Sequence, residues 1–148
     1  MRRNTIAPRS GWEKKVEGAG LVFHSPDAPY WNEAAYYSFT SAEVNMLEKT
    51  TNNLHAMCLE AVQFVIDQDR FADLKIPELA VPVIKRAWEA EPPAIYGRFD
   101  LAYDGKNPPK LLEYNADTPT SLLEAAVEFA GQVLTPGGPL VPINTWAL

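Results

Sequence analysis

Four polar side chains stand at alternate positions in two short runs of the chain. Arg98 and Asp100 lie in residues 94–103, and Glu113 and Asn115 lie in residues 110–115. Carboxylate and amide oxygens are the hard ligands that Mg²⁺ prefers, with water and phosphate oxygens completing its octahedron. A neighbouring arginine could neutralise the charge that builds on a phosphoryl group during its transfer. The four groups would therefore suit magnesium-assisted phosphoryl transfer, provided that they meet.

The elements that must bring these groups together are the two strands of a predicted β-hairpin. Residues 94–103 form an alternating run with aromatic and β-branched side chains, which predicts a strand. Asp104-Gly105-Lys106-Asn107 is typical of a turn, and residues 110–115 are predicted to form the returning strand. A four-residue turn would set Arg98 opposite Glu113, with Asp100 and Asn115 on the same face. The other face, predicted to be the core side, would carry apolar residues: Ile95, Phe99, Leu101, Leu112 and Tyr114.

A plainer interpretation of the same pattern stays open. The polar face could be a solvated surface with a cross-strand Arg98–Glu113 ion pair, of a kind that contributes about 1 kcal/mol or less.

Helices are predicted on both sides of residue 70. Thr40-Ser41-Ala42-Glu43 has the form of a capping box, which predicts a helix over residues 40–68. Its predicted buried stripe consists of Val44, Leu47, Leu54, Cys58, Ala61 and Val65. A second helix is predicted from about Pro77 to Glu91, where two prolines follow. A third is predicted over residues 119–130, with Asp117 or Thr118 as its cap. The sequence thus predicts an α/β fold with a long amphipathic helix and an antiparallel hairpin that carries the site.

Composition narrows the class of protein. The 148 residues suit one globular domain, and the net charge of −6 leaves no excess of cations for a nucleic acid. No apolar run approaches the ~18 residues of a membrane span, so neither a nucleic acid nor a membrane is expected as a partner, and a cytoplasmic location is expected. Cys58 is the single cysteine, which excludes an internal disulfide. Surface or structural roles are predicted for His24 and His55.

The motifs themselves resemble a known family. Ile95-Tyr96-Gly97-Arg98-Phe99-Asp100, followed by Leu111-Leu112-Glu113-Tyr114-Asn115-Ala116-Asp117-Thr118-Pro119-Thr120, resembles the signature of glutathionylspermidine synthases. Weaker agreement through Trp12, the Tyr30-Trp31-x-Glu33 cluster and Tyr36 extends the resemblance over roughly residues 1–130.

The resemblance implies a fold and a reaction. Such enzymes have an ATP-grasp fold preceded by a pre-ATP-grasp region, and they join glutathione to a polyamine through an acyl phosphate, using ATP and two Mg²⁺ ions. Arg98 would be the catalytic residue that steadies the phosphoryl group. The metal ligands would be Asp100, Glu113 and Asn115. Thr118 would bind glutathione. Asp117 and Glu33 are candidates for residues that hold the metal ligands in place without contacting the metal themselves.

The resemblance also predicts an incomplete enzyme. Residues 1–131 would form the pre-ATP-grasp domain. Residues 132–148 are an uncharged tail containing Pro and Gly, and its abrupt change in composition is typical of a truncated or replaced end. Without the lobes that clamp ATP, the chain is expected to be inactive alone. Two alternatives stay open: a non-catalytic module that binds Mg²⁺ or a peptide thiol, and a gene fragment whose apolar tail docks on a partner chain.

Overall fold

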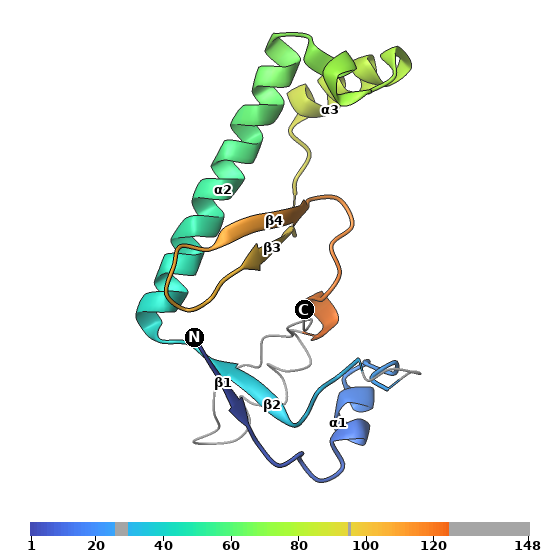
Figure 1. Cartoon of the computed structure of the whole chain (residues 1–148). Coiled ribbons are helices and arrows are strands. Elements are labelled where there is room, and N and C mark those ends of the chain that lie inside the picture. The colour runs from blue at the N-terminus through green and yellow to red at the C-terminus, as the bar shows by residue number, and fades with distance from the viewer. Residues whose placement is uncertain (26–29, 95, 125–148) are drawn as a thin grey trace.

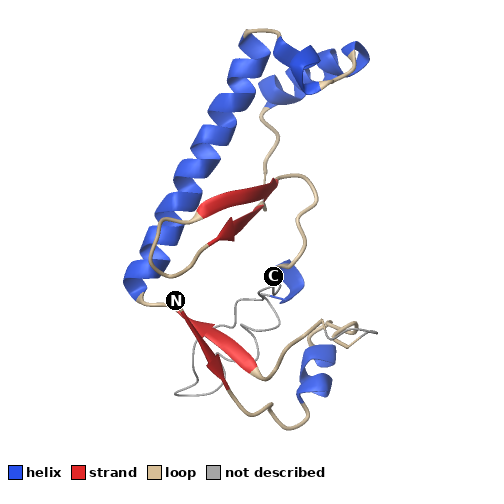
Figure 2. Cartoon of the chain, viewed as in Figure 1, coloured by secondary structure: helices blue, strands red, loops and turns tan. Residues whose placement is uncertain are grey.

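A computed structural model describes residues 1–25, 30–94 and 96–124 of the chain. The described residues form two small antiparallel sheets, each of two strands. Figures 1 and 2 show these sheets together with helices in a mixed α/β arrangement. The elements in chain order are β1 (Arg2–Thr5), α1 (Trp12–Gly18), β2 (Ala35–Ser38), α2 (Ser41–Asp67), the 3₁₀ helices η1 (Arg70–Leu74) and η2 (Glu78–Ala80), α3 (Val81–Ala90), β3 (Arg98–Ala102) and β4 (Lys110–Asn115). No helix within these ranges is long and apolar enough to cross a membrane.

The amino-terminal part folds around a small apolar cluster. β1 pairs with β2 from Arg2 opposite Ser38 to Thr5 opposite Ala35. Beside this ribbon, Val16 of α1 packs with Leu21 and Trp31, all three buried. The aromatic side chains of this amino-terminal part therefore anchor its irregular segments onto a core, because their large apolar surfaces are removed from water when they pack.

The long helix α2 begins where the sequence predicts. The hydroxyl of Thr40 accepts a hydrogen bond from the backbone N–H of Glu43 at 3.2 Å, and the carboxylate of Glu43 accepts one from the N–H of Thr40 at 2.8 Å. This reciprocal capping box satisfies backbone donors that a helix start leaves unpaired.

The buried side predicted for this helix is not confirmed. No residue of α2 is buried. Leu47, Leu54, Cys58 and Val65 of the predicted stripe are half-buried, whereas Val44 is 51% exposed and Ala61 is exposed too. The apolar periodicity predicted the presence of the helix, but it did not predict how much of the helix surface other elements cover.

The second predicted helix is present as η2 followed by α3. α3 ends at Ala90, and the next residue, Glu91, adopts the left-handed backbone conformation at φ 42° immediately before the two prolines. The third predicted helix starts later than expected: residues 116–121 are not helical, and the first helical residues are 122–124. Asp117 and Thr118 therefore do not cap it. Residues 125–130 of this helix and the predicted tail of residues 132–148 lie outside the described ranges.

The hairpin forms, but the predicted register was wrong. Arg98 stands opposite Asn115 and Asp100 opposite Glu113, rather than Arg98 opposite Glu113. Pro108 and Pro109 carry no N–H for a ladder, so pairing begins only with Ala102 opposite Lys110 and the loop is longer than four residues. The pairing then shifts between Asp100 and Leu101, which leaves Leu112 as the extra residue of a β-bulge.

The bulge also changes which of the predicted core residues are shielded from solvent. Leu112 was expected on the core side, yet it is 61% exposed. Phe99, Leu101 and Tyr114 are half-buried, and Ile95 lies outside the described ranges. The first strand is shorter than predicted because it starts at Arg98.

Candidate functional site

The four polar residues of the two motifs do share one face of the hairpin. Arg98 pairs with Asn115, and the pair formed by Asp100 and Glu113 follows two positions along the strands. Side chains two residues apart on a strand point to the same side, so the four groups converge. The intervening pair lies on the reverse face, where the rings of Phe99 and Tyr114 stack with their centroids 4.0 Å apart.

Arg98 is the centre of this face. Its Nε donates to Oδ1 of Asp100 at 2.7 Å, and its Nη2 donates to Oδ2 at 3.2 Å. Its Nη1 donates to the hydroxyl of Thr120 at 2.6 Å. The hydrogen bonds that Arg98 donates to Asp100, reinforced by the negative charges of Asp100 and Glu113, raise the pKa of the Arg98 guanidinium above its usual range. Arg98 thus forms its ion pair with Asp100, on the same strand, rather than with Glu113 across the hairpin.

Asn115 joins the two strands. With its amide oxygen turned towards Arg98, that oxygen accepts from Nη2 at 2.9 Å and the amide nitrogen donates to Oε1 of Glu113 at 3.2 Å. In this orientation every polar group of the amide faces a complementary partner. One continuous network therefore links Asp100, Arg98, Asn115 and Glu113.

The donor chemistry of this face fits a hard cation. Asp100 and Glu113 offer carboxylate oxygens and Asn115 an amide oxygen, which is the ligand set that Mg²⁺ takes together with water and phosphate. Within the part of the chain that the structure describes, no group of three or more His, Cys, Asp or Glu side chains gathers as a metal centre. A cation on this face would therefore depend on the amide and on oxygens from outside the protein.

Thr120 belongs to the site and was missed by the sequence argument. Besides accepting from Arg98 through its hydroxyl, it accepts from Tyr96 through its backbone carbonyl, 3.1 Å from the Tyr96 hydroxyl. It is followed by Ser121, whose φ of 76° is unusual for a residue other than glycine. The only signal in the sequence was its place at the end of the second motif. Thr118 and Asp117 lie just upstream with exposed side chains.

Glu33 lies in a separate interaction. It accepts from the Nε of Arg9 at 2.9 Å, forms an ion pair with the same guanidinium, and accepts from the indole of Trp31 at 3.1 Å. Burial alone would raise the pKa of Glu33, but the hydrogen bonds from Arg9 and Trp31 outweigh it and hold that pKa below its usual range. Its hydrogen-bond partners belong to the amino-terminal part of the chain and not to the hairpin.

A second polar pair reaches the neighbourhood of Arg98. The hydroxyl of Tyr30 donates to the carboxylate of Glu124, which is only 4% exposed. Burial first, then the hydrogen bond and charge of Glu124, raise the pKa of Tyr30 to about 12, while the positive charge of Arg98 acts in the opposite direction. The pair ties the amino-terminal aromatic segment to the chain that follows Thr120. Nothing in the sequence spacing predicted it.

Fold and site together define the class: a mixed α/β domain whose antiparallel hairpin presents two carboxylates, an amide and an arginine on one face. The family described as glutathionylspermidine synthase preATP-grasp matches residues 3–132, and the chain belongs to this family. The motifs in the two strands of the hairpin are those on which the resemblance rested.

Relatives of the chain have names that describe ligases, synthases or synthetases. The chain is 47% identical over 132 residues to a Haemophilus influenzae protein that has been assigned the name acid–amine ligase, covering 86% of this chain and 33% of that protein. It is 32% identical over 112 residues to the glutathionylspermidine synthase of Crithidia fasciculata, covering 72% of this chain and 15% of that enzyme. It is 34% identical over 94 residues to the bifunctional glutathionylspermidine synthetase/amidase of Escherichia coli, covering 62% of this chain and 15% of that enzyme. The chain thus spans a third or less of the length of these relatives.

Proposed function

We propose that this chain is the amino-terminal portion of an ATP-dependent carboxylate–amine ligase whose metal- and phosphate-binding groups lie on the hairpin of β3 and β4. The observation that carries the proposal is the convergence of Arg98, Asp100, Glu113 and Asn115 on one face of adjacent strands. Family membership and the acid–amine ligase among the relatives support the reaction class.

The proposed reaction has two steps. A carboxylate oxygen of a glutathione-like substrate attacks the γ-phosphorus of ATP, the bond to ADP breaks, and an acyl phosphate forms. The nitrogen of a polyamine-like substrate then attacks the acyl carbon, phosphate leaves with the bonding electron pair, and the nitrogen loses a proton to give the amide. Each step moves negative charge between phosphate oxygens, so the main demand on the protein is fixed positive charge and orientation.

Arg98 is proposed to meet that demand. Its guanidinium is held by Asp100 on one side and by Thr120 on the other, so its orientation is set before a phosphate arrives. A donor fixed in advance stabilises developing charge without the cost of reorganising itself during the reaction. The contacts with Asp100, Asn115 and Thr120 use four of the five N–H groups, so one N–H of Nη1 remains to donate to a phosphate oxygen.

Asp100, Glu113 and Asn115 are proposed to hold Mg²⁺. When bound, Mg²⁺ would neutralise charge on the phosphate oxygens. Thr118 is proposed to contact the carboxylate substrate, because its exposed hydroxyl lies on the segment between β4 and Thr120. Asp117, also exposed, is a candidate to support the ligands through water.

The ATP clamp is proposed to come from another part of the enzyme. Residues 1–131 would act as the pre-ATP-grasp domain, and the chain covers only 33% of the Haemophilus relative. The portion of such relatives that this chain does not span would supply the adenine and phosphate pocket. The isolated 148-residue chain is therefore expected to be unable to turn over ATP.

A pair of measurements tests the proposal. Calorimetric titration of the chain with Mg²⁺ in the presence of glutathione should give saturable binding that Asp100→Ala and Glu113→Ala abolish. Phosphate release from ATP with Mg²⁺, glutathione and spermidine should stay at background. Absence of saturable Mg²⁺ binding by the wild type would contradict the metal role, and sustained turnover by the isolated chain would contradict the claim of incompleteness.

A further inference from the structure

The reverse face of the hairpin is attached to α2 next to the candidate site. The hydroxyl of Tyr114 is 3.0 Å from Nδ1 of His55, which forms a hydrogen bond between β4 and the helix. The two rings meet edge to face, with centroids 6.0 Å apart and planes at 89°. Tyr114 stands between Glu113 and Asn115 in the strand, so its ring points away from their side chains and towards α2.

The same ring also contacts the first strand. It stacks on Phe99 with an angle of 16° between the planes, and Phe99 stands between Arg98 and Asp100. Gly97 leaves the space for it, because a Cβ there would lie 2.9 Å from Cε2 of Tyr114. The ring of Tyr114, which belongs to β4, thus packs against the reverse side of β3, so it contacts the backs of both strands that carry the site.

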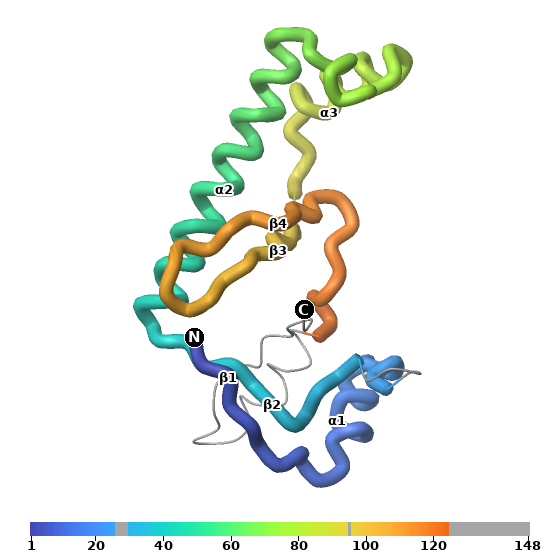
Figure 3. Tube along the Cα trace, viewed as in Figure 1, coloured from blue at the N-terminus to red at the C-terminus, as the bar shows by residue number. Residues whose placement is uncertain are grey.

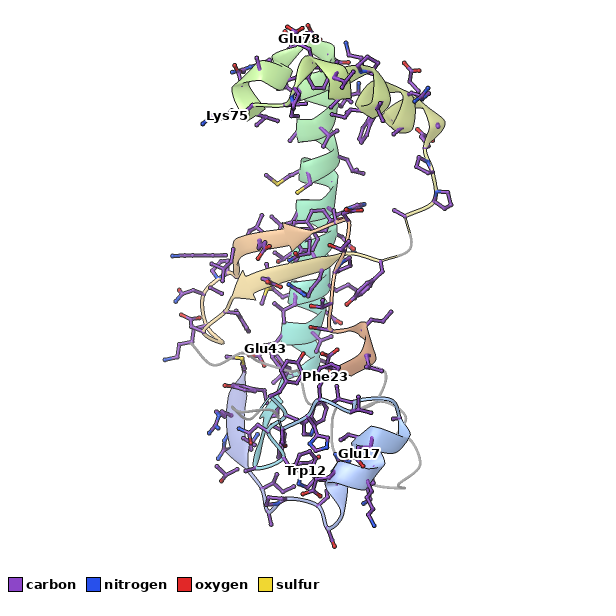
Figure 4. All side chains as sticks on the ribbon, turned by 90° about the vertical axis from the view of Figure 1, so that its right-hand side faces the viewer. Trp12, Glu17, Phe23, Glu43, Lys75 and Glu78 are labelled. Atoms are coloured by element: carbon purple, nitrogen blue, oxygen red, sulfur yellow. The ribbon has the colours of Figure 1, made fainter. Side chains whose placement is uncertain are left out.

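A second attachment lies at the other end of the hairpin. The hydroxyl of Tyr103, where the loop begins, donates to Oε1 of Glu43 at 3.2 Å. Figures 1 and 3 show α2 running beside the hairpin, and Figure 4 shows Glu43 at the start of that helix, below the strands. Two tyrosines therefore fasten the hairpin lengthwise to one helix, and only the bond of Tyr114 is adjacent to the proposed metal ligands.

We propose that His55 is a positioning residue for this site: by holding Tyr114, it fixes the angle at which Glu113 and Asn115 are presented. An isolated two-stranded hairpin is only marginally stable and can change its twist, so its site end needs an external support. His55 supplies that support from a long helix with an independent cap. The inference rests on the proposed cation-binding role of the hairpin face.

Mn²⁺ is the probe for the test, because it takes the same oxygen ligands as Mg²⁺ and is visible by magnetic resonance. His55→Leu and Tyr114→Phe each remove one side of the hydrogen bond. Each should weaken Mn²⁺ binding by about tenfold, at the lower end of what the loss of a support for metal ligands costs. The double variant should be no weaker than either single one, because both remove the same bond.

Matched variants separate positioning from general stability. Tyr103→Phe removes a comparable hydroxyl bond at the loop end, and it should leave the Mn²⁺ affinity within about twofold of wild type. His55→Asn, whose side-chain oxygen lies near the position of the imidazole Nδ1, should restore most of the affinity lost in His55→Leu. Full additivity of the two single variants, or an equal loss of affinity in Tyr103→Phe, would overturn the proposal.

A measurement without added metal keeps this inference separate from the proposed function. The Nε–H of Arg98 and the side-chain amide of Asn115 give resolvable signals in ¹⁵N-resolved NMR spectra. His55→Leu and Tyr114→Phe should both shift these signals, and Tyr103→Phe should not. If the wild type binds no Mn²⁺ but these shifts occur, the proposed function fails and the positioning role stands. Unchanged signals in both variants, with the chain still folded by circular dichroism, would overturn the positioning role itself.

Discussion

The ring of Tyr114 lies against the backbone of Gly97 so closely that no side chain fits between them. A Cβ placed on Gly97 would stand 2.9 Å from Cε2 and 3.1 Å from the hydroxyl oxygen of Tyr114. The glycine in the first motif is thus needed for its lack of a side chain, because Tyr114 of the second motif occupies the space.

Gly97→Ala should therefore destabilise the protein. Either Tyr114 moves off Phe99 and His55 or the strand backbone shifts, and such overpacking usually costs about 1 to 3 kcal/mol. Urea unfolding followed by circular dichroism measures the change. Gly18→Ala is the matched control, because a Cβ there meets nothing within 4 Å and Gly18 lies in a helix. Equal unfolding midpoints for the two variants would contradict the close contact.

The helix cap gives a prediction about stability at α2. Thr40→Ala removes the hydroxyl that accepts from the N–H of Glu43, and it should lower the free energy of unfolding by about 1 kcal/mol. Thr40→Ser retains the hydroxyl and should remain within a few tenths of wild type. A loss as large in the serine variant would show that the methyl group of Thr40, rather than its hydrogen bond, stabilises the helix start.

The hairpin loop gives a prediction about pH. Asp104 accepts from the backbone N–H groups of Asn107 and Lys106 and from the side chain of Asn107, which lowers the pKa of its carboxyl group to about 2. Because the folded pKa lies below the unfolded one, these bonds stabilise the hairpin fully above about pH 4. That contribution is lost as the pH falls towards 2.

Comparison with Asp104→Asn measures this effect. The wild type should be the more stable protein at pH 6, and the difference in unfolding free energy should shrink as the pH falls through the interval between the two pKa values. A difference that stays constant down to pH 2 would show that the charge of Asp104 is not what the loop N–H groups recognise.

Thr120 gives a prediction about the orientation of Arg98. Thr120→Val removes the acceptor of the 2.6 Å hydrogen bond from Nη1 but leaves the bonds to Asp100 in place. Rotation of the guanidinium about its Nε–Cζ bond, measured by ¹⁵N exchange spectroscopy, should become faster. Thr120→Ser should keep the slow rotation of the wild type. Identical rates in all three proteins would mean that Thr120 does not restrain Arg98.

The sequence predicted the local structures whose causes are themselves local. The capping box at Thr40 and Glu43 located the start of α2, and the prolines after Glu91 located the end of α3. Alternation along the strands also placed the four polar residues on one face, although the pairing within that face was wrong. Periodicity is a property of neighbouring residues, so it transfers directly to one helix or one hairpin.

What the sequence did not reveal depends on contacts between distant segments. The register changed because two prolines lengthen the loop to an odd number of residues, 103–109, which alone would have set Arg98 opposite Tyr114. The extra residue of the bulge, Leu112, offsets that shift and returns the polar side chains of the two strands to one face. The exposure of α2 depends on which elements reach it. The bond between His55 and Tyr114 joins residues from two elements, and an exposed histidine beside an apolar stripe gives no sign of its partner.

The most direct test of the account is to locate a bound cation on the molecule. Trace Mn²⁺ added to the ¹⁵N-labelled chain should broaden the signals of Asp100, Glu113 and Asn115 and the side chain of Arg98 first, in a saturable manner that excess Mg²⁺ reverses. Asp100→Asn and Glu113→Gln should abolish the selective broadening. Broadening centred on other acidic residues while these four signals stay sharp would contradict the assignment of the hairpin face as a magnesium site.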